Sequence, residues 1–152
     1  LSIADNIALP NLDILCEGPV GTVNRKKEKA MVDNAVKALK IKLPNAQVDA
    51  GSLSGGNQQK VIFGKWLERG PQVFMMDEPT RGIDVGAKYE IYELIINMAK
   101  QGKTIIVVSS EMPEILGITN RIGVMSNGRL AGIVNTKETN QEELLRLSAK
   151  YL

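Results

Sequence analysis

Two short apolar runs, at residues 73–76 and 104–109, are separated by a stretch with helical periodicity, and this alternation limits the folds open to the chain. Within the stretch, apolar residues recur on one helical face: Ile91, Leu94, Ile95 and Met98. Uninterrupted apolar runs that alternate with helices are typical of parallel strands buried on both faces. The sequence therefore predicts an α/β fold with a parallel sheet.

The sequence on either side of this alternation predicts further helices and a hairpin. Residues 25–29 are a charged run, interpreted as the solvated start of a helix that continues through Val32, Ala35, Val36 and Leu39. A second helix follows Gly55-Gly56-Asn57 and ends at Arg69-Gly70-Pro71, with one apolar face expected from Ile62, Phe63, Trp66 and Leu67. Residues 122–125 and 129–134 predict an antiparallel hairpin with an Asn-Gly turn. A last helix carries Leu144, Leu145 and Leu147.

Composition excludes several classes of function. The 152 residues carry 19 Lys and Arg against 17 Asp and Glu, so no strong field attracts nucleic acid or an anionic membrane. Aromatic residues are 4% of the chain and offer no platform for stacking bases, which predicts no nucleic-acid partner. Cys16 is the single cysteine and indicates a reducing compartment. A first residue of Leu instead of Met indicates a fragment of a longer protein.

Two adjacent carboxylates, Asp77 and Glu78, follow directly after the first apolar run. Carboxylates are costly to desolvate, and ligands of open α/β sheets bind at the carboxyl edge of the strands. In a P-loop ATPase the first acid holds Mg²⁺ through water and the second orients or deprotonates the attacking water. The alternative is a strand that simply ends in a polar Asp-Glu-Pro turn. This motif alone does not decide between the two.

A second motif, Leu53-Ser54-Gly55-Gly56-Asn57-Gln58, precedes the helix that ends near residue 69. Ser and Gly at a helix start expose backbone N–H groups, and the helix dipole adds a partial positive charge, which together favour anion binding. The alternative is an ordinary N-cap, because Ser and Gly are good capping residues.

Together these motifs carry a resemblance. A Leu-Ser-Gly-Gly-x-Gln turn, one helix, and an apolar strand ending in Asp-Glu-Pro-Thr resemble the ABC ATPases across Gly51–Val134. The resemblance implies a P-loop NTPase (ABC ATPase) core, with a partial parallel sheet and a C-terminal antiparallel hairpin, plus a helical subdomain. It implies ATP and Mg²⁺ as cofactors. Residues 1–70 would be the helical subdomain that carries the signature, and residues 71–152 the C-terminal part of the core.

The resemblance also implies a role for each matching position. Asp77 would hold Mg²⁺ through water, and Glu78 would be the catalytic carboxylate. Asp84, in Gly82-Ile83-Asp84, would lie in the loop through which paired domains communicate. The signature, which in this family contacts the γ-phosphate of an ATP held by the opposing domain, would comprise Ser54, Gly55, Gly56, Asn57 and Gln58.

Two departures from the family pattern matter. Ser110 stands where the family places a histidine that contacts the γ-phosphate, and the chain contains no histidine. A serine hydroxyl can hydrogen-bond phosphate but carries no positive charge, so the nucleotide site beside Glu78 is expected to be impaired. The chain also lacks a phosphate-binding loop, because Gly102-Lys103-Thr104 lies between a helix and a strand and is interpreted as a helix C-cap.

Within the family, Asp77–Lys88, with Leu53–Lys60 before it and Ser109-Ser110-Glu111 after it, resembles the C-terminal nucleotide-binding half of bacterial monosaccharide importers. The sequence from Glu111–Arg121 through Gly132-Ile133-Val134 resembles most the galactose/methyl galactoside group. This implies an ATPase that energises sugar import at the cytoplasmic face of the inner membrane. The implied partners are an N-terminal ATPase half of the same polypeptide, membrane permease subunits and, indirectly, a periplasmic sugar-binding protein.

Two other functions stay open: a non-transport ABC protein, and an ATPase-inactive fragment that acts only as an interaction module. The strand at 104–109 is expected to present an unpaired apolar edge, which favours self-association of the isolated chain.

Overall fold

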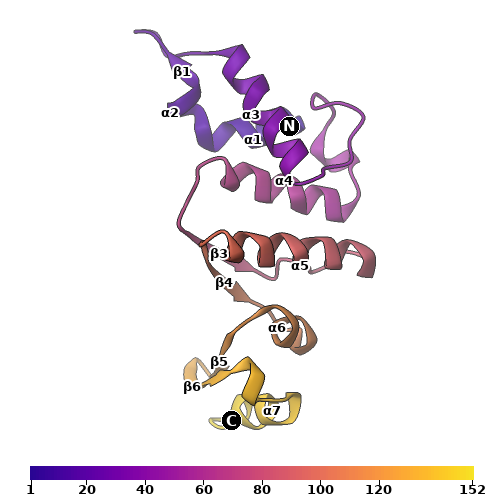
Figure 1. The fold of residues 1–152 in the computed structure, drawn as a ribbon, viewed down its shortest axis with the longest axis vertical. Helices are drawn as coiled ribbons and strands as arrows, with labels where there is room; N and C mark the ends of the chain where they lie inside the picture. The colour runs from indigo at the N-terminus through magenta and orange to yellow at the C-terminus, as the bar shows by residue number, and fades with distance from the viewer. The chain divides into compact units, whose positions relative to one another are not determined.

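A computed structural model describes all residues from 1 to 152. The chain forms two compact units. The first unit comprises residues 1–74 and 79–106, and the second comprises residues 75–78 and 107–152. In chain order the elements, most of them labelled in Figure 1, are α1 Ile3–Ala8, a 3-10 turn Leu9–Asn11, α2 Leu12–Leu15, β1 Cys16–Glu17, β2 Thr22–Val23, α3 Arg25–Ala38, a 3-10 turn Ala50–Ser52, α4 Gly55–Leu67, β3 Val73–Asp77, α5 Val85–Lys100, β4 Thr104–Val108, α6 Met112–Ile118, β5 Arg121–Ser126, β6 Arg129–Asn135, a 3-10 turn Thr136–Glu138 and α7 Gln141–Ser148. None of the helices is long and apolar enough to cross a membrane.

Helices dominate the first unit. The charged run of residues 25–29 opens α3, as predicted, because the Asn24 side chain accepts hydrogen bonds from the backbone N–H groups of Lys26 and Lys27. The apolar face of α3 is buried against α1, and the fully buried side chains around it include Ile3, Ile7 and Leu15. This helical layer supports α4 from one side.

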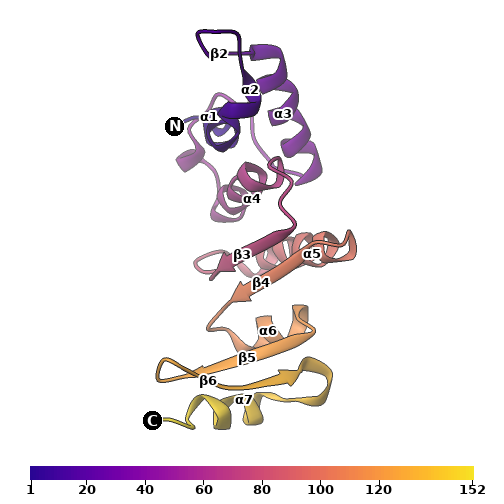
Figure 2. The ribbon, with the colours of Figure 1, turned by 90° about the vertical axis from the view of Figure 1, so that its left-hand side faces the viewer.

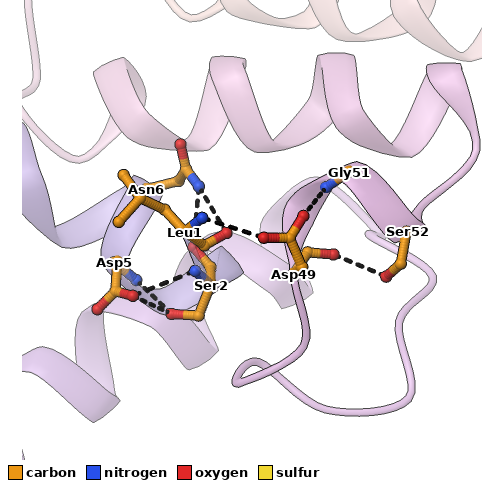
Figure 3. Close-up of polar contacts among 7 residues, drawn as sticks. All are labelled: Leu1, Ser2, Asp5, Asn6, Asp49, Gly51 and Ser52. Atoms are coloured by element: carbon orange, nitrogen blue, oxygen red, sulfur yellow. Dashed lines mark hydrogen bonds and ion pairs between the residues drawn. The ribbon is translucent and has the colours of Figure 1, made fainter.

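The start of α1 is tied to the segment that leads into α4 (Figure 3). Ser2 and Asp5 form a capping box, with the Ser2 hydroxyl 2.7 Å from a carboxylate oxygen of Asp5. Asp49 accepts a hydrogen bond from the N–H of Gly51 at 2.7 Å, and its carbonyl accepts one from the Ser52 hydroxyl at 2.7 Å. Ser2 and Asp49 also form an isolated β-bridge. These contacts fix the chain just before Leu53 and Ser54.

The buried face of α4 differs from the predicted one. Phe63 is buried as expected, but Ile62 and Trp66 are 50% and 51% exposed. The residues that face the interior include Gly56, Lys60, Val61 and Gly64. A Cβ on Gly64 would lie 3.2 Å from Leu39, at the end of α3. The prediction was wrong because close helix–helix contact selects small residues, which a hydrophobic pattern does not register.

Strands β3 and β4 pair with each other and with no other strand. The N–H of Thr104 donates to the carbonyl of Gln72 at 2.8 Å, and the N–H of Glu78 donates to that of Val108 at 2.8 Å, as in a parallel pair. The expected burial on both faces is wrong, because Met75 is 78% exposed and Val108 is 54% exposed. An apolar run shows that a strand could be buried on both faces. Whether it is buried depends on other elements packing against each face. The unpaired edge predicted for residues 104–109 is confirmed.

The second unit is built on the predicted hairpin, which Figure 2 shows with α7 beside it. Ser126 pairs with Arg129, so the turn residues are Asn127 and Gly128, both with positive φ. This is the two-residue geometry that an Asn-Gly sequence favours. Ile122, Val124 and Leu144 form the small core between the hairpin and α7.

The Gly102-Lys103-Thr104 segment ends α5, as predicted. Gly102 has φ 87°, and the N–H of Lys103 donates to the carbonyl of Met98 at 3.1 Å. This left-handed glycine with a bond back into the last turn is a helix C-cap.

Candidate functional site

The first candidate group lies at the N-terminus of α4, in the first unit. Ser54 is the N-cap residue, yet its side chain caps no backbone N–H group of the helix. Its hydroxyl instead accepts a hydrogen bond from the side-chain amide of Asn57 at 2.9 Å. Because no side chain takes the first N–H groups of α4, they stay open to an anion, with the helix dipole behind them.

Asn57 and Gln58 hold this turn in place. The side-chain oxygen of Asn57 accepts from the N–H of Lys42 at 2.9 Å, and the side-chain amide of Gln58 donates to the carbonyl of Leu53 at 2.7 Å. These contacts use both polar atoms of the Asn57 side chain and the amide nitrogen of the Gln58 side chain within the protein. In this structure the two residues therefore shape the turn, and the exposed groups are those of Ser54 and Gly55.

The Asp84 loop packs directly against the same turn. A Cβ on Gly55 would lie 3.2 Å from Ile83, and a Cβ on Gly56 would lie 2.5 Å from the Cβ of Ala87. Asp84 caps α5, with its carboxylate accepting from the N–H of Ala87 at 3.0 Å. The two glycines are thus required for packing as well as for an open helix start. The structure brings Ser54–Gln58 and Asp84 together, although the sequence places them some 30 residues apart.

Lys60 adds a buried charge to this contact that sequence reasoning missed. It is 3% exposed, and its Nζ lies 2.6 Å from a carboxylate oxygen of Glu90 on α5. The hydrogen bond from Lys60, followed by its charge, lowers the pKa of Glu90. The hydrophobic pattern of the helix gave no indication that Lys60 is buried, because a lysine in an amphipathic helix is ordinarily assigned to the solvent face.

The second candidate group, Asp77, Glu78 and Ser110, lies in the second unit. Glu78 has φ 45°, in the left-handed region that favours glycine. Its carboxylate accepts a hydrogen bond from the backbone N–H of Ser110 at 2.9 Å. Ser110 therefore lies beside Glu78. It contacts the carboxylate through its backbone N–H and not through its hydroxyl.

The turn that carries Ser110 is anchored by a buried carboxylate that sequence reasoning also missed. Glu114 on α6 is 2% exposed and accepts a short hydrogen bond from the Ser109 hydroxyl. The same hydroxyl oxygen accepts from the N–H of Glu111 at 3.0 Å. Ser109 and Glu114 thus fix the backbone on both sides of Ser110.

Asp77 has the properties that a magnesium ligand needs. It ends β3, its side chain is exposed, and it makes no hydrogen bond or ion pair within the protein. An unengaged carboxylate is the kind of hard oxygen donor that Mg²⁺ accepts directly or through water. No group of three or more His, Cys, Asp or Glu side chains that could hold a metal ion surrounds it.

Comparison with known proteins identifies a family. The family model described as ABC transporter matches residues 2–81. The galactose/methyl galactoside import ATP-binding protein MglA of Treponema denticola is 69% identical over 133 residues, which are 88% of this chain and 27% of that protein. The protein of the same name from Vibrio cholerae is 56% identical over all 152 residues, or 30% of its own length. These relatives confirm the predicted resemblance, and the chain spans less than a third of their length.

Solved structures share the fold. An ATP-binding cassette of an ABC transporter matches 97% of this chain and 62% of its own, with a TM-score of 0.75 and 23% identity. A dimeric ATP-binding cassette in a post-hydrolysis state, bound to ADP and Pi, matches 90% of this chain and 57% of its own, with a TM-score of 0.73 and 23% identity. These likenesses confirm the predicted ATPase fold with its α/β core and antiparallel hairpin.

Proposed function

Because this chain belongs to the ABC transporter family, we propose that it is the signature-bearing part of the ATP-binding subunit of a bacterial sugar importer. The names of its relatives support galactose or methyl galactoside as the transported sugar. The subunit would hydrolyse ATP with Mg²⁺ and lie peripherally at the cytoplasmic face of the inner membrane. It would work with permease subunits and, through them, a periplasmic sugar-binding protein.

The proposal divides the labour between two nucleotide-binding halves of one longer polypeptide. The other half would carry the phosphate-binding loop and the ATP that is turned over. Residues 1–70, the helical subdomain, would supply Ser54, Gly55 and Gly56 to the γ-phosphate of that ATP, with Asn57 and Gln58 shaping the turn. Asp84 would contact the opposing half. Residues 71–152 would complete the ATPase core of this half.

The observation that carries this division is the contrast between the two candidate groups. The N–H groups at the start of α4 are left open by Ser54. The carboxylate of Glu78 instead accepts a hydrogen bond from Ser110, which cannot supply the cationic contact that the family's histidine gives. Asp77 and Glu78 would hold Mg²⁺ and orient water in a site of low activity. The signature turn is therefore the more important contribution.

Substitutions in the complete polypeptide test this ranking. Ser54→Arg would fill the open helix start with a bulky cation and should lower the ATPase rate about tenfold or more, a loss of about 1.4 kcal/mol in transition-state stabilisation. Glu78→Gln, which keeps the shape of the side chain, should cost less. A larger loss from Glu78→Gln than from Ser54→Arg would contradict the proposal. Residues 1–152 alone should not hydrolyse ATP, and robust turnover by them would contradict it as well.

A further inference from the structure

Lys60 is the only lysine or arginine of the chain that is buried. Its Nζ donates to Glu90 at 2.6 Å and to the carbonyl of Lys40 at 3.3 Å. Lys40 follows the end of α3 and has φ 50°, a conformation that non-glycine residues rarely adopt. One ammonium group therefore joins α4 to α5 and to the strained turn that ends α3.

The contact between Lys60 and Glu90 lies one helical turn further along α4 and α5 than the contact between Gly56 and Ala87. Lys60 follows Gly56 by four residues on α4, and Glu90 follows Ala87 by three residues on α5. Residues at these spacings share one face of a helix, one turn apart. The two contacts are thus successive points along one helix–helix seam, and together they fix the sliding and rotation of α4 on α5.

Both candidate functional groups lie at the end of the seam where the two helices begin. Ser54 caps α4 two residues before Gly56, and Asp84 caps α5 with a hydrogen bond from Ala87. A shift of the seam would therefore move the Ser54 turn relative to the Asp84 loop. Burying an ammonium is costly, and an apolar side chain of similar size, such as methionine, would fill the same volume without that cost. A role in fixing the seam accounts for a charge at this position.

We propose that Lys60 is a positioning residue, whose buried ammonium group, paired with Glu90, holds the Ser54–Gln58 turn and the Asp84 loop together as one rigid body. The consequence for ATP hydrolysis rests on the function proposed above, because it needs the Ser54 turn to act on a nucleotide. The link between the Ser54–Gln58 turn and the Asp84 loop does not depend on that function, and it can be measured without ATP.

Three variants of the complete polypeptide test the link. Lys60→Met removes the charge but keeps the bulk, and it leaves Glu90 half-exposed to water, so the fold should survive. Lys60→Arg keeps a cation and should restore the pair. Lys42→Met is the matched control, because Lys42 is the exposed partner of the same Glu90, at 3.9 Å.

Amide hydrogen exchange gives the first measurement. The N–H of Gln58 donates to the carbonyl of Ser54 at 2.9 Å and the N–H of Lys88 donates to the carbonyl of Asp84 at 3.0 Å, so each reports on the first turn of one of the two helices. Lys60→Met should speed exchange at both amides by a similar factor, about threefold to tenfold, because local opening governs exchange. The N–H of Asn6, bonded to Ser2 in α1, should not respond. An unchanged rate at Gln58 and Lys88, or an equal rise at Asn6, would overturn the proposal.

ATP hydrolysis gives the second measurement. Lys60→Met should lower kcat several-fold with little change in KM for ATP, because the Ser54 turn would be misplaced only where it meets the transition state. Lys60→Arg should recover most of the rate, and Lys42→Met should match the parent protein. If exchange responds to Lys60→Met but kcat does not, the link stands and the proposed role of the Ser54 turn is wrong. If exchange does not respond, the link itself is wrong.

Discussion

The backbone N–H of Ser110 donates a hydrogen bond to a carboxylate oxygen of Glu78 at 2.9 Å. The N–H of Glu78 in turn donates to the carbonyl of Val108 at 2.8 Å, so the end of β4 holds the backbone of Glu78 and the turn after β4 holds its side chain. Because the contact from Ser110 uses the backbone, the side chain at position 110 has no part in holding Glu78. The contact would therefore survive any substitution at position 110 that keeps the backbone N–H.

Substitutions at Ser110 should distinguish the contribution of its backbone N–H to stability from that of its hydroxyl. Ser110→Ala keeps the N–H and should change the free energy of unfolding by less than about 0.5 kcal/mol. Ser110→Pro removes the N–H and should cost about 1 kcal/mol or more. Urea denaturation of both variants checks the difference. Equal losses from the two substitutions would show that the hydroxyl carries the contact.

Glu78 stores backbone strain that glycine would release. Its φ of 45° costs a non-glycine residue about 1 kcal/mol relative to glycine. Glu78→Gly should therefore be more stable than Glu78→Ala by about that amount, although both variants lose the hydrogen bond from Ser110. Thermal or urea denaturation compares the two. If Glu78→Ala proves to be the more stable variant, the backbone at this residue is unstrained.

Gly56 should not accept a side chain. A Cβ at Gly56 would lie 2.5 Å from the Cβ of Ala87, which real atoms do not allow, so Gly56→Ala should cost about 1–3 kcal/mol. Ala87→Gly in the same chain should recover part of that loss. Gly117→Ala is the control, because a Cβ there meets nothing within 4 Å, and it should be neutral or stabilising. Urea denaturation measures all three, and a loss from Gly117→Ala as large as that from Gly56→Ala would contradict the steric explanation.

The Lys60–Glu90 pair should make stability depend on pH in the acid range. The hydrogen bond from Lys60, then its charge, lowers the pKa of Glu90 in the folded chain, while nearby Asp84 opposes this. The contribution of the pair is therefore complete above the unfolded pKa of about 4.3 and is lost as the pH falls through the folded pKa. Lys60→Met should lose stability less steeply than the parent protein below pH ~4.5, whereas Lys42→Met should keep most of the slope. Denaturation series across this range check the slopes, and identical slopes would exclude the pair as their cause.

The exposed edge of β4 should make residues 1–152 associate. Ile106 is 45% exposed on a strand with one paired neighbour, an arrangement that invites pairing with another chain. Light scattering should detect a dimer or larger species whose mass grows with concentration. Ile106→Lys should weaken this association, whereas Ile62→Lys, at a 50% exposed position of α4, should not. A monomer at every concentration would contradict the prediction.

Much of this fold could be predicted from the sequence, because it depends on local interactions. The Asn127-Gly128 turn, the C-cap at Gly102 and the apolar faces of α3 and α5 were all predictable, because each depends on residues within one or two turns of the chain. The order of the two motifs around Ser54 and Asp77 was enough to indicate the family. Neither motif needed a distant residue to be recognised.

The tertiary structure decided what no local pattern could. Ile62 and Trp66 were predicted to be buried and are half-exposed, while Lys60 and Glu114 are buried without any prediction that they would be. Burial depends on which element packs against a residue, and a charge can be buried only where a partner from another element offsets its desolvation. The sequence by itself indicated the family and the helices and strands from α3 onward, apart from α6. The contact of Gly56 with Ala87, and the hold of the Ser110 backbone on Glu78, arose only when segments about 30 residues apart were packed together.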